Sequence, residues 1–425
     1  MREPDPHSSV SELQALLHPM SCEEFLRSYF SRASVFIEGT AGKFGDLFSW
    51  EKLDRALERG QKIEDKRYNI HASFARGDDP GSSRQMVEAT HSEVRSLFDS
   101  GATVCITNIH MADPVLAKWA QTIRTQLNFS GTVGVNCYLS PEGVGLSTHY
   151  DKRVVTNIQI AGRKRWRYST RAAKPWPDHN AVYQDGKAEP VGVDVGTRPP
   201  DLEFREVEMK PGDLLSLPAG AWHSAKASGE SSLAINLYFQ PQNFLEQLLP
   251  LLQSFASSNG DWRGGTPATV EKVGGQMPPA VAAYLRERLG EFAALARHLQ
   301  DQPQVMIEPW LAASTHFPYS GWQPTPLASL QGLTNDQRFR VAKSSLRFVQ
   351  VLDKLVVPCE HNLLRFPLAA GRMLERLASE PGSFTMHDVL AWGVRPEGPD
   401  PQKVLSYLQI LIENRIVEPA VSPRV

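Results

Sequence analysis

Between residues 131 and 240 the chain is a succession of short runs rich in β-branched and aromatic residues, separated by residues typical of turns. Many short strands at this spacing indicate a β-sandwich or β-barrel, whereas a parallel sheet would need long helices between its strands. We therefore expect an antiparallel β structure in the centre of the chain. The predicted strands are Val133–Leu139, Val154–Ile160, Arg163–Tyr168, Leu214–Leu217 and Leu233–Phe239.

The segments on either side of this central region predict helices, so the fold class is α+β. Apolar residues recur at helical spacing in both flanks. Residues up to about 30 are predicted to be helical in two pieces broken at Pro19, and further helices are predicted at 50–57, 113–127, 244–255 and 280–299. From about residue 361, a helix, a short helix, a longer helix and a strand follow one another in a winged-helix-like order. We expect three domains, 1–240, 241–360 and 361–425. The Pro- and Gly-containing stretch 175–200 is expected to be a surface excursion.

Composition and charge bear on compartment and partners. The chain has 425 residues and a formal net charge of −2, and its four cysteines form no CxxC pair, which argues against a disulfide framework or a zinc knuckle. There is no N-terminal apolar segment and no run of about 18 apolar residues, so we expect a cytoplasmic protein with no membrane association. Residues 361–425 contain seven basic and seven acidic residues, so we expect no DNA binding.

The motif with the clearest chemistry is Ser147-Thr148-His149-Tyr150-Asp151, which is followed 74 positions after His149 by His223. Residues two apart on a strand point to the same face, so His149 and Asp151 can bind one metal ion together. His223 ends a proline- and glycine-containing turn beside another predicted strand. Two imidazoles and one carboxylate on one face of a metal are typical of non-haem Fe(II) oxygenases.

With these motifs, residues 131–240 resemble a JmjC-type or cupin-like 2-oxoglutarate oxygenase. The matching segments are Val135–Pro141, His149–Asp151, Ile158–Arg167 and the segment that ends at His223. The strongest likeness is to the ribosomal oxygenase branch, in which a helical dimerisation region and a winged helix follow the JmjC domain. The resemblance implies a double-stranded β-helix (jelly roll) that binds Fe(II) through His149, Asp151 and His223 and uses 2-oxoglutarate and O₂ as co-substrates.

The same resemblance places a basic residue thirteen positions after the motif aspartate, where it holds the far carboxylate of 2-oxoglutarate. That position is Lys164. Strand alternation supports this choice, because Lys164 shares a face with Trp166 and Tyr168, whereas the three arginines at 163, 165 and 167 occupy the other face. Asn136 and Asn236 match asparagines that line this pocket in the family.

The substrate is predicted less directly. The resemblance and the roughly 300 residues outside the oxygenase core favour hydroxylation of a protein or peptide side chain, with release of succinate and CO₂. Lys152-Arg153 follows the motif aspartate, whereas ribosomal oxygenases usually have acidic residues there. The arginine or histidine substrates of that family are therefore not assigned directly to this protein. We expect these cations and the arginine face 163–167 near the barrel entrance, and a homodimer through the helical region. The alternatives are a hydroxylase of a biosynthetic peptide or free amino acid, and a non-catalytic cupin-fold binding or regulatory protein.

Overall fold

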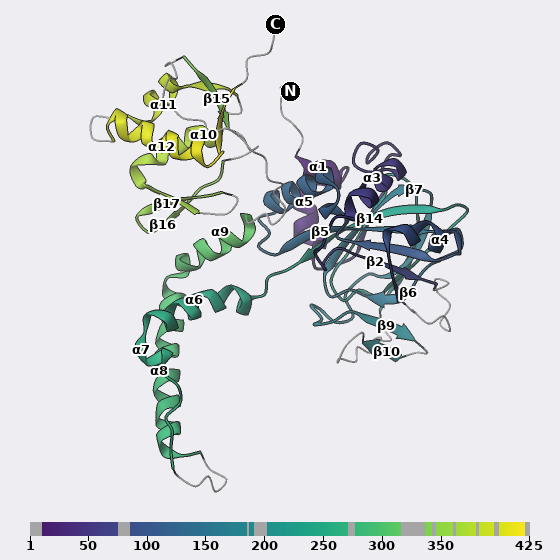
Figure 1. Ribbon diagram of the computed structural model, residues 1–425, viewed down its shortest axis with the longest axis horizontal. Coiled ribbons are helices and arrows are strands. Elements are labelled where there is room, and N and C mark those ends of the chain that lie inside the picture. The colour runs from purple at the N-terminus through teal and green to yellow at the C-terminus, as the bar shows by residue number, and fades with distance from the viewer. Residues whose placement is uncertain are drawn as a thin grey trace. The chain divides into compact units, whose positions relative to one another are not determined.

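The computed structural model describes residues 11–74, 86–184, 187–190, 202–270, 277–315, 336–341, 346–359, 363–379, 382–394 and 399–420. The chain divides into two compact units, Met1–Pro241 and Gln242–Val425 (Figure 1). Each unit is described by itself. The division into three domains with boundaries at 240 and 360 stays a prediction.

The first unit is built on two antiparallel sheets. The larger sheet has the strand order β1 (Val35–Ile37), β12 (Leu214–Leu217), β7 (Val154–Ala161), β14 (Ser232–Gln240), β5 (Thr132–Ser140), β4 (Thr103–Thr107), β2 (Asn69–Ser73) and β3 (Met86–Ala89). The smaller sheet has the order β10 (Lys187–Pro190), β9 (Ala181–Gln184), β6 (Gly145–Tyr150), β13 (His223–Ala227), β8 (Lys164–Ser169) and β11 (Phe204–Met209). Between β5 and β14 the chain passes back and forth between the sheets, as expected of a double-stranded β-helix.

Helices cover the outer face of the larger sheet. The described helices of this unit are α1 (Glu12–Leu17), α2 (Cys22–Glu24), η1 (Phe25–Tyr29), α3 (Trp50–Gly60), η2 (His91–Glu93), α4 (Val94–Asp99), η3 (Ile109–Met111) and α5 (Pro114–Gln126). Helix α5 begins at Pro114, and the carboxylate of the preceding Asp113 accepts hydrogen bonds from the Val115 and Leu116 N–H groups, an N-cap typical of a helix start.

The two faces of β14 show how the sheet separates a helix-covered core from the barrel interior. Leu233, Leu237 and Phe239 belong to the core that the helices share with the larger sheet, whereas Tyr238 belongs to a second core with side chains of the smaller sheet such as Trp166. This alternation places even-numbered residues of β14 inside the barrel. We therefore expect a functional site in the interior of the barrel, between the two sheets.

All five strands predicted in the central region are present. The stretch 175–200, predicted to be a surface excursion, contributes β9 and β10, and β9 pairs with β6 in the smaller sheet. Its residues 185–186 and 191–200 lie outside the described part of the chain. The runs Ala181–Gln184 and Lys187–Pro190 are only four residues long each, too short for strand periodicity to reveal them.

The second unit contains helices α6 (Phe244–Ser258), α7 (Gly260–Arg263), α8 (Pro279–Asp301), η4 (Pro303–Met306), α9 (Ile307–Thr315), η5 (Leu368–Ala370), α10 (Gly371–Ser379), α11 (Met386–Gly393) and α12 (Pro401–Glu413). One small sheet has the order β16 (Val349–Val351), β17 (Lys354–Pro358), β18 (Leu363–Pro367), and another has the order β19 (Phe384–Thr385), β15 (Arg338–Val341), β20 (Val417–Pro419). Strands β15, β16 and β17 lie within the range 241–360, which was predicted to be helical. They are only three to five residues long, so their sequences did not reveal them. None of the described helices combines the length and apolar character needed to span a bilayer.

Candidate metal centre

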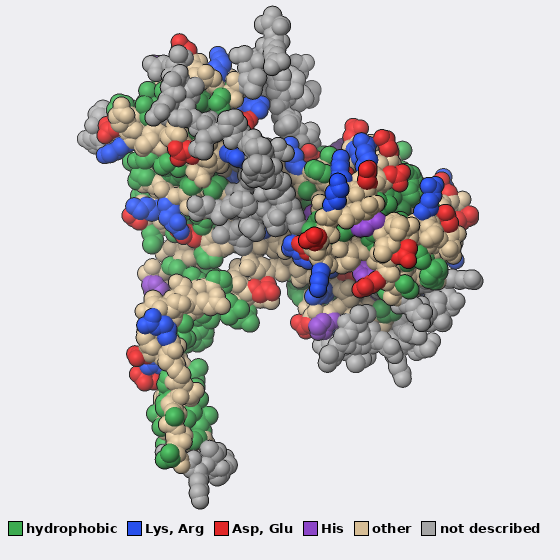
Figure 2. Space-filling model, viewed as in Figure 1, with side chains coloured by type: hydrophobic (Ala, Val, Ile, Leu, Met, Phe, Trp, Pro, Cys, Tyr) green, Lys and Arg blue, Asp and Glu red, His purple; other side chains and the backbone are tan. Residues whose placement is uncertain are grey.

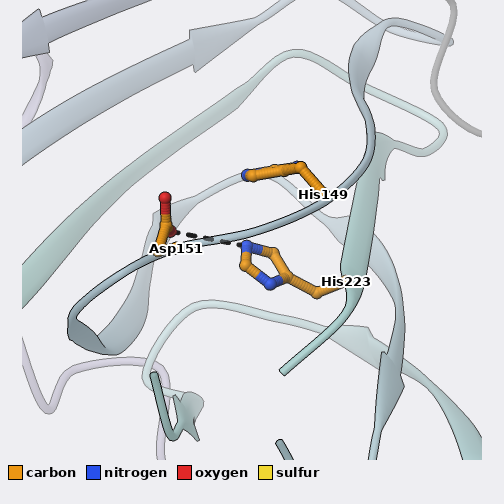
Figure 3. A group of neighbouring side chains, drawn as sticks. All are labelled: His149, Asp151 and His223. Atoms are coloured by element: carbon orange, nitrogen blue, oxygen red, sulfur yellow. Dashed lines mark ion pairs between the residues drawn. The ribbon is translucent and has the colours of Figure 1, made fainter. Parts of the chain in front are cut away.

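Strands β6 and β13 bring two histidines together. They pair antiparallel in the smaller sheet, and His149 stands directly opposite His223. Directly opposed residues have Cβ atoms about 5 Å apart, so their imidazoles lie side by side, with ring centroids 4.2 Å apart. Asp151 follows β6 by one residue, and its carboxylate points back toward the same place (Figure 3).

The turn before His223 is tied to the residue after β6. The Gly220 N–H donates a hydrogen bond of 2.8 Å to the Asp151 carbonyl oxygen. Gly220 has φ +83°, and a Cβ there would lie 1.9 Å from the Lys174 carbonyl oxygen, so only glycine fits without distortion. Next to this link, Tyr150 and Trp222 pack edge to face with ring centroids 4.7 Å apart. The two halves of the motif are thus joined by backbone and side-chain contacts.

The three side chains have the geometry of a metal-binding triad. One possible ligand atom from each of His149, Asp151 and His223 lies within 4.8 Å of the other two. The distance from His223 Nε2 to Asp151 Oδ2 is 3.7 Å. His149 Nδ1 lies 2.7 Å from the Ser147 carbonyl oxygen, and His223 Nδ1 lies 2.9 Å from the Ala221 carbonyl oxygen.

These carbonyl contacts decide which imidazole nitrogen can bind a metal. A carbonyl oxygen only accepts, so each Nδ1 carries the proton and each Nε2 carries the lone pair. Backbone carbonyls commonly orient metal-binding histidines in this way. Both histidines are 4% exposed. Side chains this polar are rarely buried in a β-sheet unless they bind a ligand or form hydrogen bonds. The donor set of two nitrogens and one carboxylate fits Fe(II) with open coordination positions.

Lys164 is a buried cation in the barrel. It is 2% exposed, and among the described residues no carboxylate forms an ion pair with it. Its Nζ lies 5.9 Å from the centre of the Tyr138 ring. Burial lowers the pKa of Lys164 to about 8, because the charged form loses its hydration. A buried ammonium without a counter-ion is costly, so this position is suited to an anionic group of a ligand.

Tyr138 was not selected from the sequence, although it lies two residues after Asn136 on the same strand face. Burial raises the pKa of Tyr138 well above its ordinary value, and the neighbouring Cys105 and Asp151 side chains raise it further. Its hydroxyl is therefore protonated and able to donate. A face shared with Asn136 was the signal that could have identified it.

The asparagines form a row across three neighbouring strands. Asn236 on β14 stands opposite Asn136 on β5 and opposite Asn157 on β7. The Asn236 Nδ2 donates to the Asn157 Oδ1 over 2.7 Å, which leaves Asn236 Oδ1 and Asn157 Nδ2 buried without a protein partner. Asn136 Oδ1 instead accepts from the Asn108 N–H over 3.0 Å. Asn157 was missed because its place depends on the pairing of β7 with β14.

The three arginines at 163, 165 and 167 lie close to glutamates of the neighbouring strand β11. Arg163 and Arg165 lie near Glu208 of β11, at 3.8 and 3.9 Å, and Arg167 lies 3.8 Å from Glu206. The arginines occupy the face of β8 opposite to Lys164, so they point away from the barrel interior. This outward direction is the one that alternation along β8 predicts, and the expected position of the arginines near the barrel entrance stays a prediction.

The two residues after Asp151 are also engaged. The Lys152 N–H donates to Asn180 Oδ1 over 2.8 Å. The Arg153 guanidinium lies 4.3 Å from the centre of the Tyr238 ring, a cation–π contact. Arg153 therefore has a packing role beside the barrel interior.

Comparisons with known proteins agree with this architecture. Residues 111–247 match the JmjC domain family model. Ribosomal oxygenase 1 of Gallus gallus is 28% identical over 272 residues, covering 59% of this chain and 41% of that protein. A protein of Drosophila grimshawi named bifunctional lysine-specific demethylase and histidyl-hydroxylase NO66 is 30% identical over 274 residues, covering 61% of this chain and 35% of that protein. The match thus spans less than half of either relative.

A solved structure is similar over nearly the whole chain. It is that of YcfD, a ribosomal oxygenase from Escherichia coli, in complex with cobalt and 2-oxoglutarate. The similarity covers 94% of this chain and 98% of that chain, with a TM-score of 0.56 and 18% sequence identity. It shows a shared fold and confirms the predicted JmjC/cupin architecture. The chain therefore contains a JmjC domain and is a homologue of proteins named ribosomal oxygenase and NO66.

Proposed function

We propose that this protein is an Fe(II)- and 2-oxoglutarate-dependent oxygenase that hydroxylates a protein or peptide side chain and releases succinate and CO₂. The observation that carries the proposal is the combination of the His149, Asp151 and His223 triad with a buried, uncompensated Lys164 in one barrel. A metal-binding triad alone fits many cupin-like proteins. An additional buried cation fits a dicarboxylate co-substrate.

Each residue has a defined task in this proposal. His149, Asp151 and His223 hold the iron, which when bound supplies the activation of O₂ and the oxidation of a C–H bond. Lys164 pairs with the far carboxylate of 2-oxoglutarate, and the Tyr138 hydroxyl donates a hydrogen bond to the same group. The unpartnered amide atoms of Asn157 and Asn236 offer a donor and an acceptor to whatever occupies the interior, and Asn136 supports this row from β5.

The pKa of Lys164 predicts how co-substrate affinity depends on pH. Because this pKa lies at about 8 in the free protein, the ammonium is charged at pH 7 and mostly neutral at pH 9. Only the charged form pairs with a carboxylate, so we expect the Kd of 2-oxoglutarate to rise about tenfold between pH 7 and pH 9. Calorimetry with the Co(II)-loaded protein measures this. In Lys164→Arg the profile should be flat, because a guanidinium does not titrate in this range; an unchanged wild-type Kd would contradict the assignment.

The class of substrate follows from the relatives. One relative is named a histidyl-hydroxylase and others are named ribosomal oxygenases, and the fold of this chain matches a ribosomal oxygenase over 94% of its length. The test is succinate formation with Fe(II) and 2-oxoglutarate, comparing a panel of ribosomal proteins and peptides with the twenty free amino acids. We expect stimulation by a polypeptide and a mass gain of one oxygen atom on one of its residues.

The control for this experiment is the Asp151→Ala variant, which should form no substrate-stimulated succinate. Stimulation by a free amino acid and by no polypeptide would contradict the protein-substrate proposal and favour a small-molecule hydroxylase. Absence of any 2-oxoglutarate turnover or binding would favour a non-catalytic cupin-fold protein.

The second unit supports two further parts of the proposal. Helices α10, α11 and α12 share one core with the sheet of β15, β19 and β20, an arrangement that fits the winged-helix-like unit expected near the C-terminus. On α8, Leu285, Leu289 and Phe292 are 37%, 64% and 36% exposed. Their spacing of four and three residues places them on one helix face, and hydrophobic side chains (green) are visible along this helix in Figure 2. Such a stripe fits a homodimer interface.

We therefore expect the wild-type protein to sediment as a dimer and the Leu289→Glu variant to sediment as a monomer, because a carboxylate would be buried unpaired in the interface. Glu287→Lys is the matched control. Glu287 is exposed on the opposite side of α8, so its charge reversal should leave the dimer intact. A monomeric wild-type protein at micromolar concentration would contradict this part of the proposal.

A further inference from the structure

A half-buried arginine lies close to the metal triad in the chain. Arg153 follows Asp151 by two residues and comes directly before β7, and its guanidinium lies 4.3 Å from the centre of the Tyr238 ring. Among the described residues, no carboxylate forms an ion pair with this guanidinium, and no hydrogen bond joins it to another group. A guanidinium stacked on an aromatic face keeps its N–H donors in its own plane, away from the ring. Beyond its packing role, Arg153 therefore has donors to offer to a ligand.

The tyrosine on which Arg153 stacks is held in place at its far end. The Tyr238 hydroxyl donates to Asn108 Oδ1 over 2.5 Å, and the Asn108 N–H donates to Asn136 Oδ1 over 3.0 Å. A Cβ at Gly134 would lie 2.5 Å from the Tyr238 hydroxyl oxygen, so the missing side chain at Gly134 makes room for the ring. Tyr238 is 5% exposed. Arg153 thus rests on a rigid support, which reduces the entropy lost when it binds an anion.

The second cation of the barrel, Lys164, lies toward the other end of β14. Ala234 stands opposite Tyr138, and the centre of the Tyr138 ring lies 5.9 Å from Lys164 Nζ. Tyr238, on which Arg153 stacks, is four residues further along β14, which is about 13 Å on a strand. In the proposed function Lys164 pairs with the far carboxylate of 2-oxoglutarate. Arg153 is therefore available to a different anion.

We propose that Arg153 is a specificity-determining residue that binds the side-chain carboxylate of an Asp or Glu in the polypeptide substrate. This inference rests on the proposed function. The guanidinium offers a planar pair of N–H donors, which matches the two oxygens of a carboxylate. Because Arg153 is only two residues from Asp151, an acidic side chain bound there holds a neighbouring residue of the peptide close to the metal centre. Partial burial of Arg153 makes this ion pair stronger than one on an open surface.

The first test is selection from a degenerate library of short peptides with amidated C-termini, in which side chains carry the only carboxylates. The library is passed over immobilised protein loaded with Co(II) and saturating 2-oxoglutarate, and the retained peptides are sequenced by mass spectrometry. We expect Asp and Glu to be enriched by the wild-type protein and this enrichment to be lost in Arg153→Gln. Arg153→Lys keeps a charge but not the planar fork, so it should retain part of the enrichment.

The most enriched acidic peptide then gives a measure of affinity. Replacing its acidic residue with the corresponding amide should raise the Kd for wild type about tenfold or more, the usual effect of a charge-assisted hydrogen bond. The same replacement should change the Kd for Arg153→Gln by less than about twofold, because the two changes remove one interaction. Arg163→Gln is the matched control, since Arg163 is exposed and lies near Glu208, and it should keep the wild-type selection. Calorimetry with 2-oxoglutarate verifies that the co-substrate pocket of each variant is intact.

Equal enrichment of acidic residues by wild type and Arg153→Gln would assign the carboxylate to another cation and overturn the inference. The absence of acidic enrichment in the wild type would overturn it too, while leaving the proposed function intact as long as 2-oxoglutarate binds. Enrichment seen only in a library with free C-termini would show recognition of a chain end and would also overturn the inference. If the wild-type protein binds no 2-oxoglutarate, the proposed function itself fails.

A second measurement uses the wild-type protein alone and decides the matter if Arg153→Gln does not fold. Phenylglyoxal modifies accessible guanidinium groups, and the modification of each arginine is followed by peptide mass spectrometry. We expect the selected acidic peptide to slow modification of Arg153 severalfold and its amide counterpart to slow it less, with Arg163 unaffected by either. Equal rates at Arg153 with and without the acidic peptide would overturn the inference.

Discussion

Replacing any one of His149, Asp151 or His223 with alanine is expected to reduce Fe(II)-dependent turnover of 2-oxoglutarate by more than a hundredfold. The three possible ligand atoms lie within 4.8 Å of one another, and in the proposed site each residue would supply one of three protein ligands. Loss of an outer partner of a ligand typically costs about 10–100-fold in metal affinity or activity, so loss of a ligand itself should cost more. Release of CO₂ from 2-oxoglutarate and equilibrium dialysis with Fe(II) measure activity and binding separately.

Two controls separate a lost metal site from a lost fold. His298→Ala removes an exposed histidine of α8 and should retain wild-type turnover. The thermal unfolding of the three ligand variants should stay cooperative, because β6 and β13 keep their backbone pairing. Retention of wild-type decarboxylation in all three variants would show that the triad does not hold the metal.

Lys164→Ala is expected to raise the KM for 2-oxoglutarate about tenfold to a hundredfold. A hydrogen bond to a charged group is worth about 1.5–3 kcal/mol, and the site excludes water around Lys164, which is 2% exposed. Lys164→Arg keeps a cation and should lose less. The kinetic constants for 2-oxoglutarate at saturating substrate measure the effect.

A matched control is available on the adjacent strand. Lys226 of β13 is exposed and stands opposite Arg165, so it lies on the outward face that Lys164 avoids, and Lys226→Ala should leave the KM unchanged. Lys164→Met should lose co-substrate affinity while unfolding at the same or a higher temperature, since it removes a buried charge without a partner. An unchanged KM in Lys164→Ala would assign the carboxylate to another cation.

Much of the barrel could be predicted from the sequence because its strands carry periodic apolar residues. Strands β5, β7, β8, β12 and β14 were predicted in this way, and the alternation along β8 was sufficient to place Lys164 inside. The short strands that bear the histidines have weaker signals. In β6, Gly145–Tyr150, and β13, His223–Ala227, polar and small residues take positions that a purely structural strand would fill with apolar side chains, so motif spacing located them instead of periodicity.

The residues that the sequence did not reveal depend on strand register. Asn157 joins the site only because β7 pairs with β14 so that Asn157 stands opposite Asn236. Register between segments 30 to 80 residues apart is set by the packing of the whole sheet, and no local pattern encodes it. The outward direction of the arginines on β8 was encoded by alternation, but their ion pairs with Glu206 and Glu208 on β11 depend on register as well.

Binding of Fe(II) by the triad and of 2-oxoglutarate beside Lys164 can be tested together by the visible absorption of the protein mixed anaerobically with Fe(II) and 2-oxoglutarate. A 2-oxo acid that chelates Fe(II) through its carboxylate and keto oxygens gives a charge-transfer band. We expect a band that saturates at one Fe(II) per chain, that is lost in His223→Ala, and that needs more 2-oxoglutarate to reach saturation in Lys164→Ala. Absence of the band in the wild-type protein, or a band of equal intensity in His223→Ala, would contradict this assignment.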